Sequence, residues 1–586
     1  MTKAAPSRLD FRNTNSLWGG VLVETLHRLG LRHAVISPGS RSTPLTMALA
    51  RHRGIASLPV LDERSAAFFA LGLAKRTQRP VVLVCTSGTA GANYYPAVIE
   101  AQESGVPLLV ITADRPPEMR DCRSGQTIDQ ARLYGDHVNF FHEFAVPEAT
   151  LPMLRYLRQT VVHAWERTQW PDAGPVHLNA PFRDPLPPRA DGRTGEIRAT
   201  WDEERFFGTI RPPQKILSRI EASGFPVHKR GVIIVGPIDG APSPVEAGIL
   251  AGLAYNLGWP ILADGLSGLR GDAERYPGMI TRYDAILRSG RAARQLNPEV
   301  VLGIGGWPTS KVLRSWLERS GAESWLVSSR RSNQDSLHLA TRQLRCSLWA
   351  FAEAVASSPG HDEAYLDAWR RAEFAAARSL DRRLDRTDWL FEGRAAHELS
   401  RHLPAGTPVF VANSMPVRDV EYFWNAGDPG HPLYFNRGAN GIDGTLSTAL
   451  GVAHADRPAV LLTGDLALLH DANGLLIRPK FRSGLTIVLI NNRGGGIFEH
   501  LPVAAFEPPF EEFFATPQAV DVGTLCRAHG VEFVRVRDWS RFARLVRALP
   551  GEGVRVLELR TDRKRDAAFR QRLCAEAAAA AEAALG

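Results

Sequence analysis

Short apolar runs alternate with helix-like segments along this chain, and that alternation constrains the fold more than any other feature. In the N-terminal region the helix-like segments are residues 13–29, 43–51, 64–78 and 90–103. The apolar runs of the same region are residues 33–36, 55–61, 81–85 and 107–111. Apolar strands separated by helices are typical of βα units, so the pattern predicts a parallel sheet with helices on both faces.

The same alternation recurs in two further regions. Their apolar runs are residues 231–235, 260–262, 300–304 and 324–327, then residues 408–411, 432–435, 459–462 and 485–490. Residues 181–200 are rich in Pro and charged side chains, which is typical of a linker. We therefore predict an α/β fold of three domains with parallel sheets. Their predicted bounds are residues 1–190, 191–365 and 366–586.

Three other segments have structural interpretations. The glycine-rich turn at 303–306 is a weak nucleotide-binding signal, and a purely structural turn after a strand is favoured. Residues 363–386 are rich in Ala and Arg and predict a long helix leading into the last region. Residues 566–585 predict an Ala-rich helix, to which we assign a structural role only.

Polar loops follow the apolar runs of the first and last regions. In the first region they are residues 37–41, 62–64, 86–89 and 112–117. In the last region they are residues 413–418, 436–444, 463–465 and 491–496. The carboxyl ends of parallel strands meet at one edge of a sheet, where open α/β sheets bind ligands. Four such loops in one region therefore predict a binding site.

Asp465 and Asn492 end two successive apolar runs of the last region. Asp465 offers a carboxylate, and Asn492 offers a neutral amide oxygen. The glycines at 494–496 let the backbone turn freely and approach a ligand closely. Oxygen donors beside exposed backbone amides suit Mg²⁺ bound together with a diphosphate. From this stretch alone, an ordinary βαβ unit with Asp and Asn in its turns stays the alternative.

Composition limits the classes of protein to consider. The 586 residues, 44% of them apolar, suffice for two or three domains with sizeable cores. The formal charge is +8, yet no basic run points to nucleic acid. We expect no membrane span and no signal peptide, because the apolar runs are short. The five cysteines are scattered and odd in number, which argues against a disulfide framework or a zinc site and predicts a cytoplasmic protein.

The Gly464-Asp465 pair followed by Asn491-Asn492 resembles the signature of thiamine diphosphate enzymes. Leu466 stands where those enzymes usually have a further Gly. Six more motifs resemble one branch, the MenD family of 2-succinyl-5-enolpyruvyl-6-hydroxy-3-cyclohexene-1-carboxylate synthases. They are residues 37–45, 62–64, 86–90, 113–118, 436–444 and 497–498. The motifs lie in both terminal regions in the family's order, whereas the middle region matches poorly.

The resemblance implies a fold, a reaction and partners. The three domains would be an N-terminal pyrimidine-binding domain, a central α/β domain, and a C-terminal diphosphate- and metal-binding domain. The implied reaction is decarboxylation of 2-oxoglutarate and conjugate, Stetter-like addition of the succinyl carbanion to isochorismate, in menaquinone biosynthesis. The implied cofactors are thiamine diphosphate and Mg²⁺ or Mn²⁺. The implied assembly is a homodimer, or a homotetramer, in which Glu63 and Asp465 of different subunits face each other.

The resemblance also assigns residues to the cofactor. Glu63 is the catalytic carboxylate that hydrogen-bonds the aminopyrimidine ring, and we expect burial to raise its pKa; a Glu that only stabilises a helix N-terminus is the alternative. By the same resemblance Ile442 would be the apolar wedge that bends the cofactor, with a core residue of a tight turn as the alternative. Asp465, Asn492 and the Gly494 carbonyl would be the metal ligands. The implied cofactor contacts are Glu63, Thr86, Gly88, Ser414, Ile442, Gly464, Asp465, Leu466, Asn492, Gly494 and Ile497.

Two dicarboxylic substrates call for several arginines, because a guanidinium can bind a carboxylate through two hydrogen bonds. The implied substrate contacts are Ser40, Arg41, Arg115, Gln126, Lys311, Ser414, Arg418, Arg437, Ile497, Phe498 and Leu501. The last three would form an apolar wall, with ordinary core packing as the alternative. Arg493 stands where the family often has Asn, and Gly496 where some relatives have Gln, so contacts at these two positions stay open.

Two alternative functions also stay open. The chain could be another thiamine diphosphate enzyme, such as an acetolactate synthase or a 2-oxoacid decarboxylase, although these do not need the same set of arginines. It could instead be a non-catalytic relative that only binds a ligand or a partner. The joint presence of Glu63, Asp465 and Asn492 argues against such a decayed site.

Overall fold

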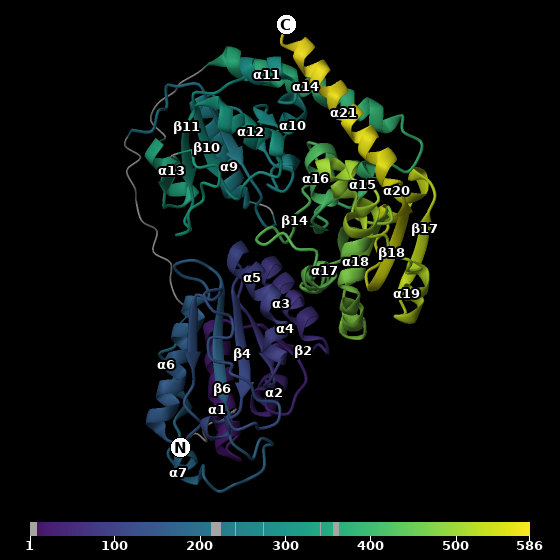
Figure 1. The fold of residues 1–586 in the computed structure, drawn as a ribbon. Coiled ribbons are helices and arrows are strands. Elements are labelled where there is room, and N and C mark those ends of the chain that lie inside the picture. Colours follow the sequence, from purple (N-terminus) through teal and green to yellow (C-terminus); the bar gives the residue numbers. More distant parts are fainter. Residues whose placement is uncertain (1–8, 212–223, 241, 274, 340, 356–361) are drawn as a thin grey trace. The chain divides into compact units, whose positions relative to one another are not determined.

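The computed structural model describes residues 9–211, 224–240, 242–273, 275–339, 341–355 and 362–586 (Figure 1). These residues form three six-stranded sheets, in which every strand pair is parallel. The strand orders are β2-β1-β3-β4-β6-β5, β12-β11-β10-β7-β8-β9 and β14-β13-β15-β16-β18-β17. The predicted fold class, three α/β domains with parallel sheets, is confirmed.

Contacts within the chain group it into two compact units. The described residues of the first unit are 9–211, 436–455 and 471–482. The second unit contains the described residues between 224 and 435, together with 456–470 and 483–586. The first sheet belongs to the first unit, and the other two sheets belong to the second.

The first sheet lies at the centre of the first unit. Its strands are β1 (His33–Ile36), β2 (Ala56–Pro59), β3 (Val81–Cys85), β4 (Leu108–Asp114), β5 (Phe140–Glu143) and β6 (Pro175–Pro181). The helices are α1 (Thr14–Leu29), α2 (Thr43–Arg51), α3 (Glu63–Thr77), α4 (Ala90–Asn93), α5 (Tyr95–Ser104), α6 (Leu151–Arg167), α7 (Gly195–Ala199), α8 (Glu203–Phe207) and α17 (Thr445–His454), with the 3₁₀ segments η1 (Pro117–Met119) and η3 (Ala472–Lys480). Helices α1 and α6 pack on the sheet through side chains such as Leu22, Leu157 and Val82. Helix α3 packs against α17.

The middle sheet belongs to the second unit. Its strands are β7 (Gly231–Val235), β8 (Ile261–Ala263), β9 (Met279–Ile280), β10 (Val300–Ile304), β11 (Glu323–Val327) and β12 (Arg342–Leu344). The helices are α9 (Pro244–Leu257), α10 (Tyr283–Ile286), α11 (Gly290–Gln295), α12 (Lys311–Ser320), α13 (Leu348–Val355) and α14 (Glu363–Asp385), with the 3₁₀ segment η2 (Arg270–Asp272). The C-terminal helix α21 (Arg563–Ala584) packs along α14, and both contribute side chains to the core around Trp369.

The third sheet also belongs to the second unit. Its strands are β13 (Val409–Val411), β14 (Leu433–Tyr434), β15 (Ala459–Gly464), β16 (Gly484–Asn491), β17 (Glu532–Val536) and β18 (Gly553–Arg560). The helices are α15 (Glu392–His402), α16 (Met415–Phe423), α18 (Asp465–His470), α19 (Val522–Ala528) and α20 (Trp539–Arg547), with the short segments η4 (Gly496–His500), η5 (Pro502–Ala505) and η6 (Glu511–Ala515). Leu399 of α15 and Val420 of α16 belong to the same core as Val411, Leu462 and Val488 of the strands.

The first and third sheets have the same strand order, which fixes where ligands are expected. In the first sheet β2 lies on one side of β1 and β3 lies on the other. In the third sheet β14 lies on one side of β13 and β15 lies on the other. The chain therefore reverses direction across the sheet between β1 and β3, and again between β13 and β15. In open α/β sheets, ligands bind beyond the carboxyl ends of the strands at such a switch point.

The middle sheet has its own switch point, between β7 and β10, but the backbones there are packed together. A Cβ on Gly236 would lie 1.7 Å from the carbonyl oxygen of Gly306. The cavity beside this turn measures only about 30 Å³. These observations agree with the structural interpretation of the turn at 303–306.

Each predicted apolar run overlaps a strand, whereas β5, β6, β9, β12, β17 and β18 were not predicted. Leu186, Ile197 and Phe207, within and just beyond the predicted linker, are buried in the core of the first unit. The domain bounds 1–190, 191–365 and 366–586 stay predictions. Among the helices of the described residues, none combines the length and the hydropathy needed to cross a bilayer.

Candidate active site

Asp465 and Asn492 lie at neighbouring strand ends of the third sheet. Strands β15 and β16 pair with Gly464 opposite Ile490. Asp465 begins α18 directly after β15, and Asn492 follows the last residue of β16. Both side chains are buried. The strand register thus brings together the two oxygen donors that the sequence predicted as metal ligands.

Backbone amides orient the Asp465 carboxylate. The N–H of Gly494 donates to Oδ2 over 3.0 Å, and the N–H of Leu466 donates to Oδ1 over 2.7 Å. Burial raises the pKa of Asp465 to about 6, although these hydrogen bonds lower it. A bound cation would stabilise the ionised form of such a carboxylate.

Asn492 presents an unpaired oxygen. Its Nδ2 donates to Glu392 Oε2 over 2.8 Å, whereas its Oδ1 is buried without a hydrogen-bond partner. Leaving a buried acceptor unpaired costs about 1–3 kcal/mol. The position therefore suits a ligand that takes an electron pair from this oxygen.

A hard divalent cation fits the donors at these two strand ends. Gly494, with φ +132, accepts a hydrogen bond from the N–H of Gly496 over 2.9 Å, and a carbonyl retains a second lone pair. One carboxylate, one amide oxygen and one carbonyl are the donor types that Mg²⁺ and Mn²⁺ prefer. Over the described parts of the chain, no three His, Cys, Asp or Glu side chains cluster as a metal site, so a site here depends on mixed oxygen donors.

Ser414 has a strained backbone. It precedes α16 with φ 71 and ψ −124, a backbone conformation that residues other than Gly rarely adopt. Such strain concentrates at ligand-binding sites. Arg418, one helical turn later, donates to the Ser414 carbonyl oxygen. Both residues follow β13, the strand beside β15.

Arg418 lies near two other arginines. Burial lowers the pKa of its guanidinium and the charges of Arg314 and Arg570 lower it further, whereas the Tyr422 hydroxyl and the Asp419 carboxylate oppose this effect. Burial also lowers the pKa of His500 to about 4, and the charges of Arg570 and Arg418 add to this effect. A concentration of positive charge in a partly buried position attracts anionic ligands.

The predicted apolar wall lies just after the metal loop. Ile497 and Phe498 are half-buried in η4, and Leu501 is half-buried directly after it. The rings of Phe498 and Phe514 meet edge to face, with centroids 5.8 Å apart. Lys311 begins α12 and is exposed. It lines an open groove whose lining includes none of the other predicted site residues.

In the first unit, the loop at 37–41 packs directly on the loop that follows β3. Ile36 pairs with Val84, so β1 and β3 end side by side. The N–H of Arg41 donates to Thr86 Oγ1 over 3.3 Å. A Cβ on Gly39 would lie 2.2 Å from the Cβ of Thr86, so this approach requires Gly. Ser40 is exposed in the same loop.

Two arginines lie together at this edge of the first sheet. Arg41 is buried, and its Nη1 donates to the Phe182 carbonyl oxygen over 2.9 Å, while its Nε is buried without a partner. Arg115 donates to the Ser87 hydroxyl and, over 2.9 Å, to the Gly125 carbonyl oxygen. Burial lowers the pKa of Arg41, and the charge of Arg115 lowers it further. Two neighbouring cations with spare donors suit an anionic ligand.

Gln126 and Gly88 are joined through the loop that follows β3. Gln126, with φ 55, donates from Nε2 to the Ser87 carbonyl oxygen over 2.9 Å. A Cβ on Gly88 would lie 2.9 Å from Gln126 Cγ. The N–H of Gly88 donates to Oε1 of the buried Gln130 over 2.9 Å. Gln130 was not predicted, because no motif distinguishes it from other polar loop residues.

Glu63 begins α3, close to the end of β3. Asp62 caps the helix by accepting the N–H of Ser65 over 3.0 Å. Burial raises the pKa of Cys85 and of Tyr94, and the charge of Glu63 adds to both effects. Glu63 itself is half-buried in the single chain.

The loop that contains Ile442 also belongs to the first unit. Gly444, with φ +62, lies against the Phe68 ring of α3, where a Cβ would come within 1.9 Å. Glu100 accepts backbone N–H groups of the loop over 3.0 and 2.7 Å. Ile442 and Arg437 are both half-buried in this loop. The structure thus brings the predicted apolar wedge and the helix that begins with Glu63 into one unit.

Most of the predicted residues fall into two groups at sheet edges, whereas Ile442 and Arg437 lie in the 436–444 loop of the first unit and Lys311 lies apart at the start of α12. The group at the first sheet comprises Ser40, Arg41, Glu63, Thr86, Gly88, Arg115 and Gln126. The group at the third sheet comprises Ser414, Arg418, Gly464, Asp465, Leu466, Asn492, Gly494, Ile497, Phe498 and Leu501. Sequence reasoning missed Glu392, which directly contacts Asn492, because Glu392 follows no strand and belongs to no motif.

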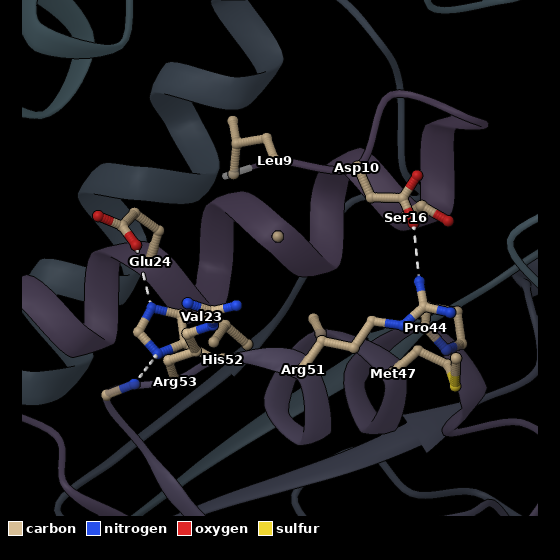
Figure 2. A pocket seen from close by; sticks show the side chains of 13 residues that line it. Leu9, Asp10, Ser16, Val23, Glu24, Pro44, Met47, Arg51, His52 and Arg53 are labelled. Atoms are coloured by element: carbon tan, nitrogen blue, oxygen red, sulfur yellow. Dashed lines mark hydrogen bonds and ion pairs between the residues drawn. The ribbon is translucent and has the colours of Figure 1, made fainter. Parts of the chain in front are cut away.

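A separate cavity of about 400 Å³ lies between α1 and α2 in the first unit (Figure 2). At its wall, His52 Nε2 lies 3.1 Å from Glu24 Oε2, and Arg51 Nη1 lies 3.3 Å from Asp10 Oδ2. These four groups therefore pair with one another, and none of the predicted site residues lines the cavity. The candidate site is at the strand ends and not in this cavity.

Three family models match the chain in sequence order. The N-terminal TPP binding domain of thiamine pyrophosphate enzymes matches residues 18–133. The thiamine pyrophosphate middle domain matches residues 196–411, and the C-terminal TPP binding domain matches residues 417–559.

Curated proteins match over nearly the whole chain. The 2-succinyl-5-enolpyruvyl-6-hydroxy-3-cyclohexene-1-carboxylate synthase of Gloeothece citriformis is 51% identical, with 95% of this chain and 97% of that protein covered. Proteins of the same name are 48% identical in Rippkaea orientalis, with 97% and 98% covered, and 51% identical in Synechococcus sp. strain JA-3-3Ab, with 96% and 96% covered. The chain therefore belongs to the thiamine pyrophosphate enzymes and, among them, to the family of 2-succinyl-5-enolpyruvyl-6-hydroxy-3-cyclohexene-1-carboxylate synthases.

Proposed function

We propose that this chain is a cytoplasmic, thiamine diphosphate-dependent carboligase of menaquinone biosynthesis. It decarboxylates 2-oxoglutarate and adds the succinyl group to isochorismate, giving 2-succinyl-5-enolpyruvyl-6-hydroxy-3-cyclohexene-1-carboxylate and CO₂. The observation that carries the proposal is the arrangement of donors at the edge of the third sheet. Asp465 follows β15, and Asn492, with its unpaired oxygen, follows β16 on one side of β15; Ser414 and Arg418 follow β13 on the other side of β15. Relatives that share half of the sequence over nearly the whole chain support the substrate pair.

Five of the predicted cofactor contacts have a defined chemical task. When bound, thiamine diphosphate supplies a carbon nucleophile and takes up the electron pair that decarboxylation releases. Asp465, Asn492 and the Gly494 carbonyl would hold Mg²⁺ or Mn²⁺, which neutralises the charge of the diphosphate. Glu63 would share a proton with a ring nitrogen of the pyrimidine, and Ile442 would support the rings. The remaining contacts are proposed for Thr86, Gly88, Ser414, Gly464, Leu466 and Ile497.

The carboxylates of the two substrates account for the number of arginines among the predicted contacts. 2-Oxoglutarate and isochorismate each carry two carboxylates, and Arg41, Arg115, Arg418 and Arg437 would bind them. An arginine with an unpaired, buried N–H, such as Arg41, gains most from a carboxylate because the ligand removes an unsatisfied donor. Ser40, Gln126, Ser414 and Lys311 would add hydrogen bonds, and Ile497, Phe498 and Leu501 would exclude water from the reacting carbons.

We expect each active site to be shared between subunits of a homodimer, or of a homotetramer built from two such dimers. Glu63 of one subunit and Asp465 of another would contact the same cofactor. Phe506 and Phe513, which follow the metal loop, are 66% and 70% exposed in the single chain, and exposed aromatic surface often marks an interface.

Mixing two inactive variants tests this sharing. Glu63→Gln and Asp465→Ala subunits, unfolded and refolded together, should form hybrid dimers with one intact site. Recovery of up to about a quarter of wild-type activity is expected from random pairing across a two-fold interface. No recovery, although native mass spectrometry shows hybrids, would contradict shared sites.

The reaction itself is tested with purified protein, 2-oxoglutarate, isochorismate, thiamine diphosphate and Mg²⁺. CO₂ release and the coupled product, identified by mass spectrometry, are expected only when both cofactors are present. CO₂ release without a coupled product, or preference for pyruvate as the donor, would favour a decarboxylase or an acetolactate synthase instead. Absence of any cofactor-dependent thermal stabilisation would favour a non-catalytic relative.

A further inference from the structure

Glu392 contacts the amide of Asn492 from the side opposite the unpaired oxygen. Glu392 is the first residue of α15 and is 2% exposed. Oε2 accepts a hydrogen bond from Asn492 Nδ2 over 2.8 Å. An ionised carboxylate only accepts hydrogen bonds, so it can pair with the NH₂ group of the amide and not with its oxygen. Glu392 therefore determines which end of the Asn492 amide faces away from it.

The orientation that Glu392 imposes is the one that a cation needs. With Nδ2 turned toward Glu392, the Asn492 Oδ1 is buried and has no partner. The opposite orientation would present the NH₂ group, which cannot donate an electron pair to a metal. Gly496 leaves room for this arrangement, because a Cβ there would lie 2.7 Å from Asn492 Nδ2.

Glu392 is itself held by a buried ionic network. Arg570 of α21 donates from Nη2 to Glu392 Oε1 over 2.8 Å and to Asp419 Oδ1 over 2.7 Å. All three of these side chains are at most 3% exposed. Asp566, one turn before Arg570, accepts the backbone N–H of Glu392 over 3.0 Å. Breaking a buried pair of this kind is costly, so the carboxylate has little freedom to turn.

We propose that Glu392, fixed by Arg570 and Asp419, is a positioning residue that directs the Asn492 oxygen toward the divalent cation. This inference rests on the proposed cofactor site. It gives the C-terminal helix α21 a role in cofactor binding, in addition to the structural role predicted from its sequence. Removing a residue that orients a metal ligand typically lowers metal affinity by about 10- to 100-fold.

Glu392→Gln tests the proposal through a change that retains the side-chain shape. Arg570 requires an acceptor, so the oxygen of the introduced glutamine should turn toward Arg570 and its NH₂ group toward Asn492. The Asn492 amide should then flip, with its NH₂ group facing the cation. Binding of Mn²⁺ with thiamine diphosphate, measured from the free Mn²⁺ signal in electron paramagnetic resonance, should weaken about 10- to 100-fold.

A second substitution at Asn492 separates orientation from general damage. Asn492→Asp alone should weaken Mn²⁺ binding, because two carboxylates would then face each other where Asn492 and Glu392 now meet. In the Glu392→Gln background the same substitution should strengthen Mn²⁺ binding, since one aspartate oxygen accepts from the introduced glutamine and the other faces the cation. An effect of the same sign in both backgrounds would overturn the proposal.

The neighbouring residue provides a matched control. Asn491 Nδ2 donates to Glu558 Oε1 over 2.7 Å, and Glu558 is 1% exposed and pairs with Arg535 and Arg560. Glu558→Gln therefore removes the same charge from a similar arrangement one residue away, and it should leave Mn²⁺ affinity unchanged. Equal losses in both variants would contradict a specific role for Glu392. If the wild type shows no Mn²⁺ binding that depends on thiamine diphosphate, the proposed cofactor site is wrong instead.

Discussion

Arg115 lies close enough to Arg41 for its charge to lower the pKa of the Arg41 guanidinium. The two side chains come from different strand-end loops of the first sheet, and Arg41 is buried with an unpaired Nε. Like charges in a partly buried position repel each other, and a bound carboxylate converts that repulsion into attraction. This edge of the first sheet therefore suits an acidic ligand, although the charges of Asp184 and Asp114 raise the pKa of Arg41 against this effect.

Arg41→Met should weaken recognition of the acidic substrate. We expect the KM for 2-oxoglutarate to rise at least about tenfold, since a charged hydrogen-bonding partner is lost. Thermal unfolding of the substrate-free variant should change much less. Arg51→Met is the control, because Arg51 is a 51% exposed arginine of the same unit paired with Asp10. Equal changes in KM in the two variants would mean that Arg41 does not bind substrate.

Ser414→Gly should stabilise the fold while lowering activity. Glycine adopts φ 71 without the penalty that Ser414 incurs, so the free energy of unfolding in urea should rise by about 1 kcal/mol. Loss of the hydroxyl should reduce kcat/KM. Ser414→Ala is the matched control, because it removes the hydroxyl but retains the strain and should not gain stability. Equal stability of the Gly and Ala variants would show that no strain is stored there.

Gly494→Ala should disrupt the metal loop. Gly494 has φ +132, and a Cβ would lie 2.2 Å from the Ala515 carbonyl oxygen, so the backbone must shift. We expect the concentration of Mg²⁺ that half-saturates thermal stabilisation by thiamine diphosphate to rise at least about tenfold. Gly551→Ala, where a Cβ would meet nothing within 4 Å, is the control and should bind Mg²⁺ normally.

The sequence predicted the strands that read as continuous apolar runs, and it missed strands with other patterns. β6 begins and ends with Pro, and β18 alternates Val and Leu with Arg and Glu, so neither contains such a run. Asp465 and Asn492 were found because they follow apolar strands. Their roles as ligands stay predictions. The orientation of the Asn492 amide was beyond sequence reasoning, because it depends on Glu392, 100 residues earlier, and on Arg570 in another helix.

Glu421 should make the stability of the unliganded protein depend on pH. Burial and the Asp264 carboxylate together raise its pKa to about 8, against the effect of Arg270. Because the folded state holds this proton more tightly than the unfolded state, stability should fall as pH rises from about 4.5 through 8.

Glu421→Gln should remove that dependence. Relative to wild type, the free energy of unfolding of the variant should increase between pH 5 and pH 8, by on the order of 2–4 kcal/mol. Urea unfolding at a series of pH values measures the difference in free energy of unfolding between the variant and the wild type. The contributions of other titrating groups are the same in both proteins and cancel from this difference. A difference that stays constant across this range would show that Glu421 titrates normally.

The proposed role of Glu63 is to activate thiamine diphosphate in this chain. The most direct measurement is the rate of hydrogen–deuterium exchange at C2 of bound thiamine diphosphate in the absence of substrate. The exchange is stopped with acid and quantified by NMR. Wild-type protein should accelerate the exchange, and Glu63→Gln should slow it by about 10²- to 10⁴-fold while cofactor binding and thermal unfolding stay near normal. Equal exchange rates in the two proteins, with the cofactor bound in both, would contradict the account.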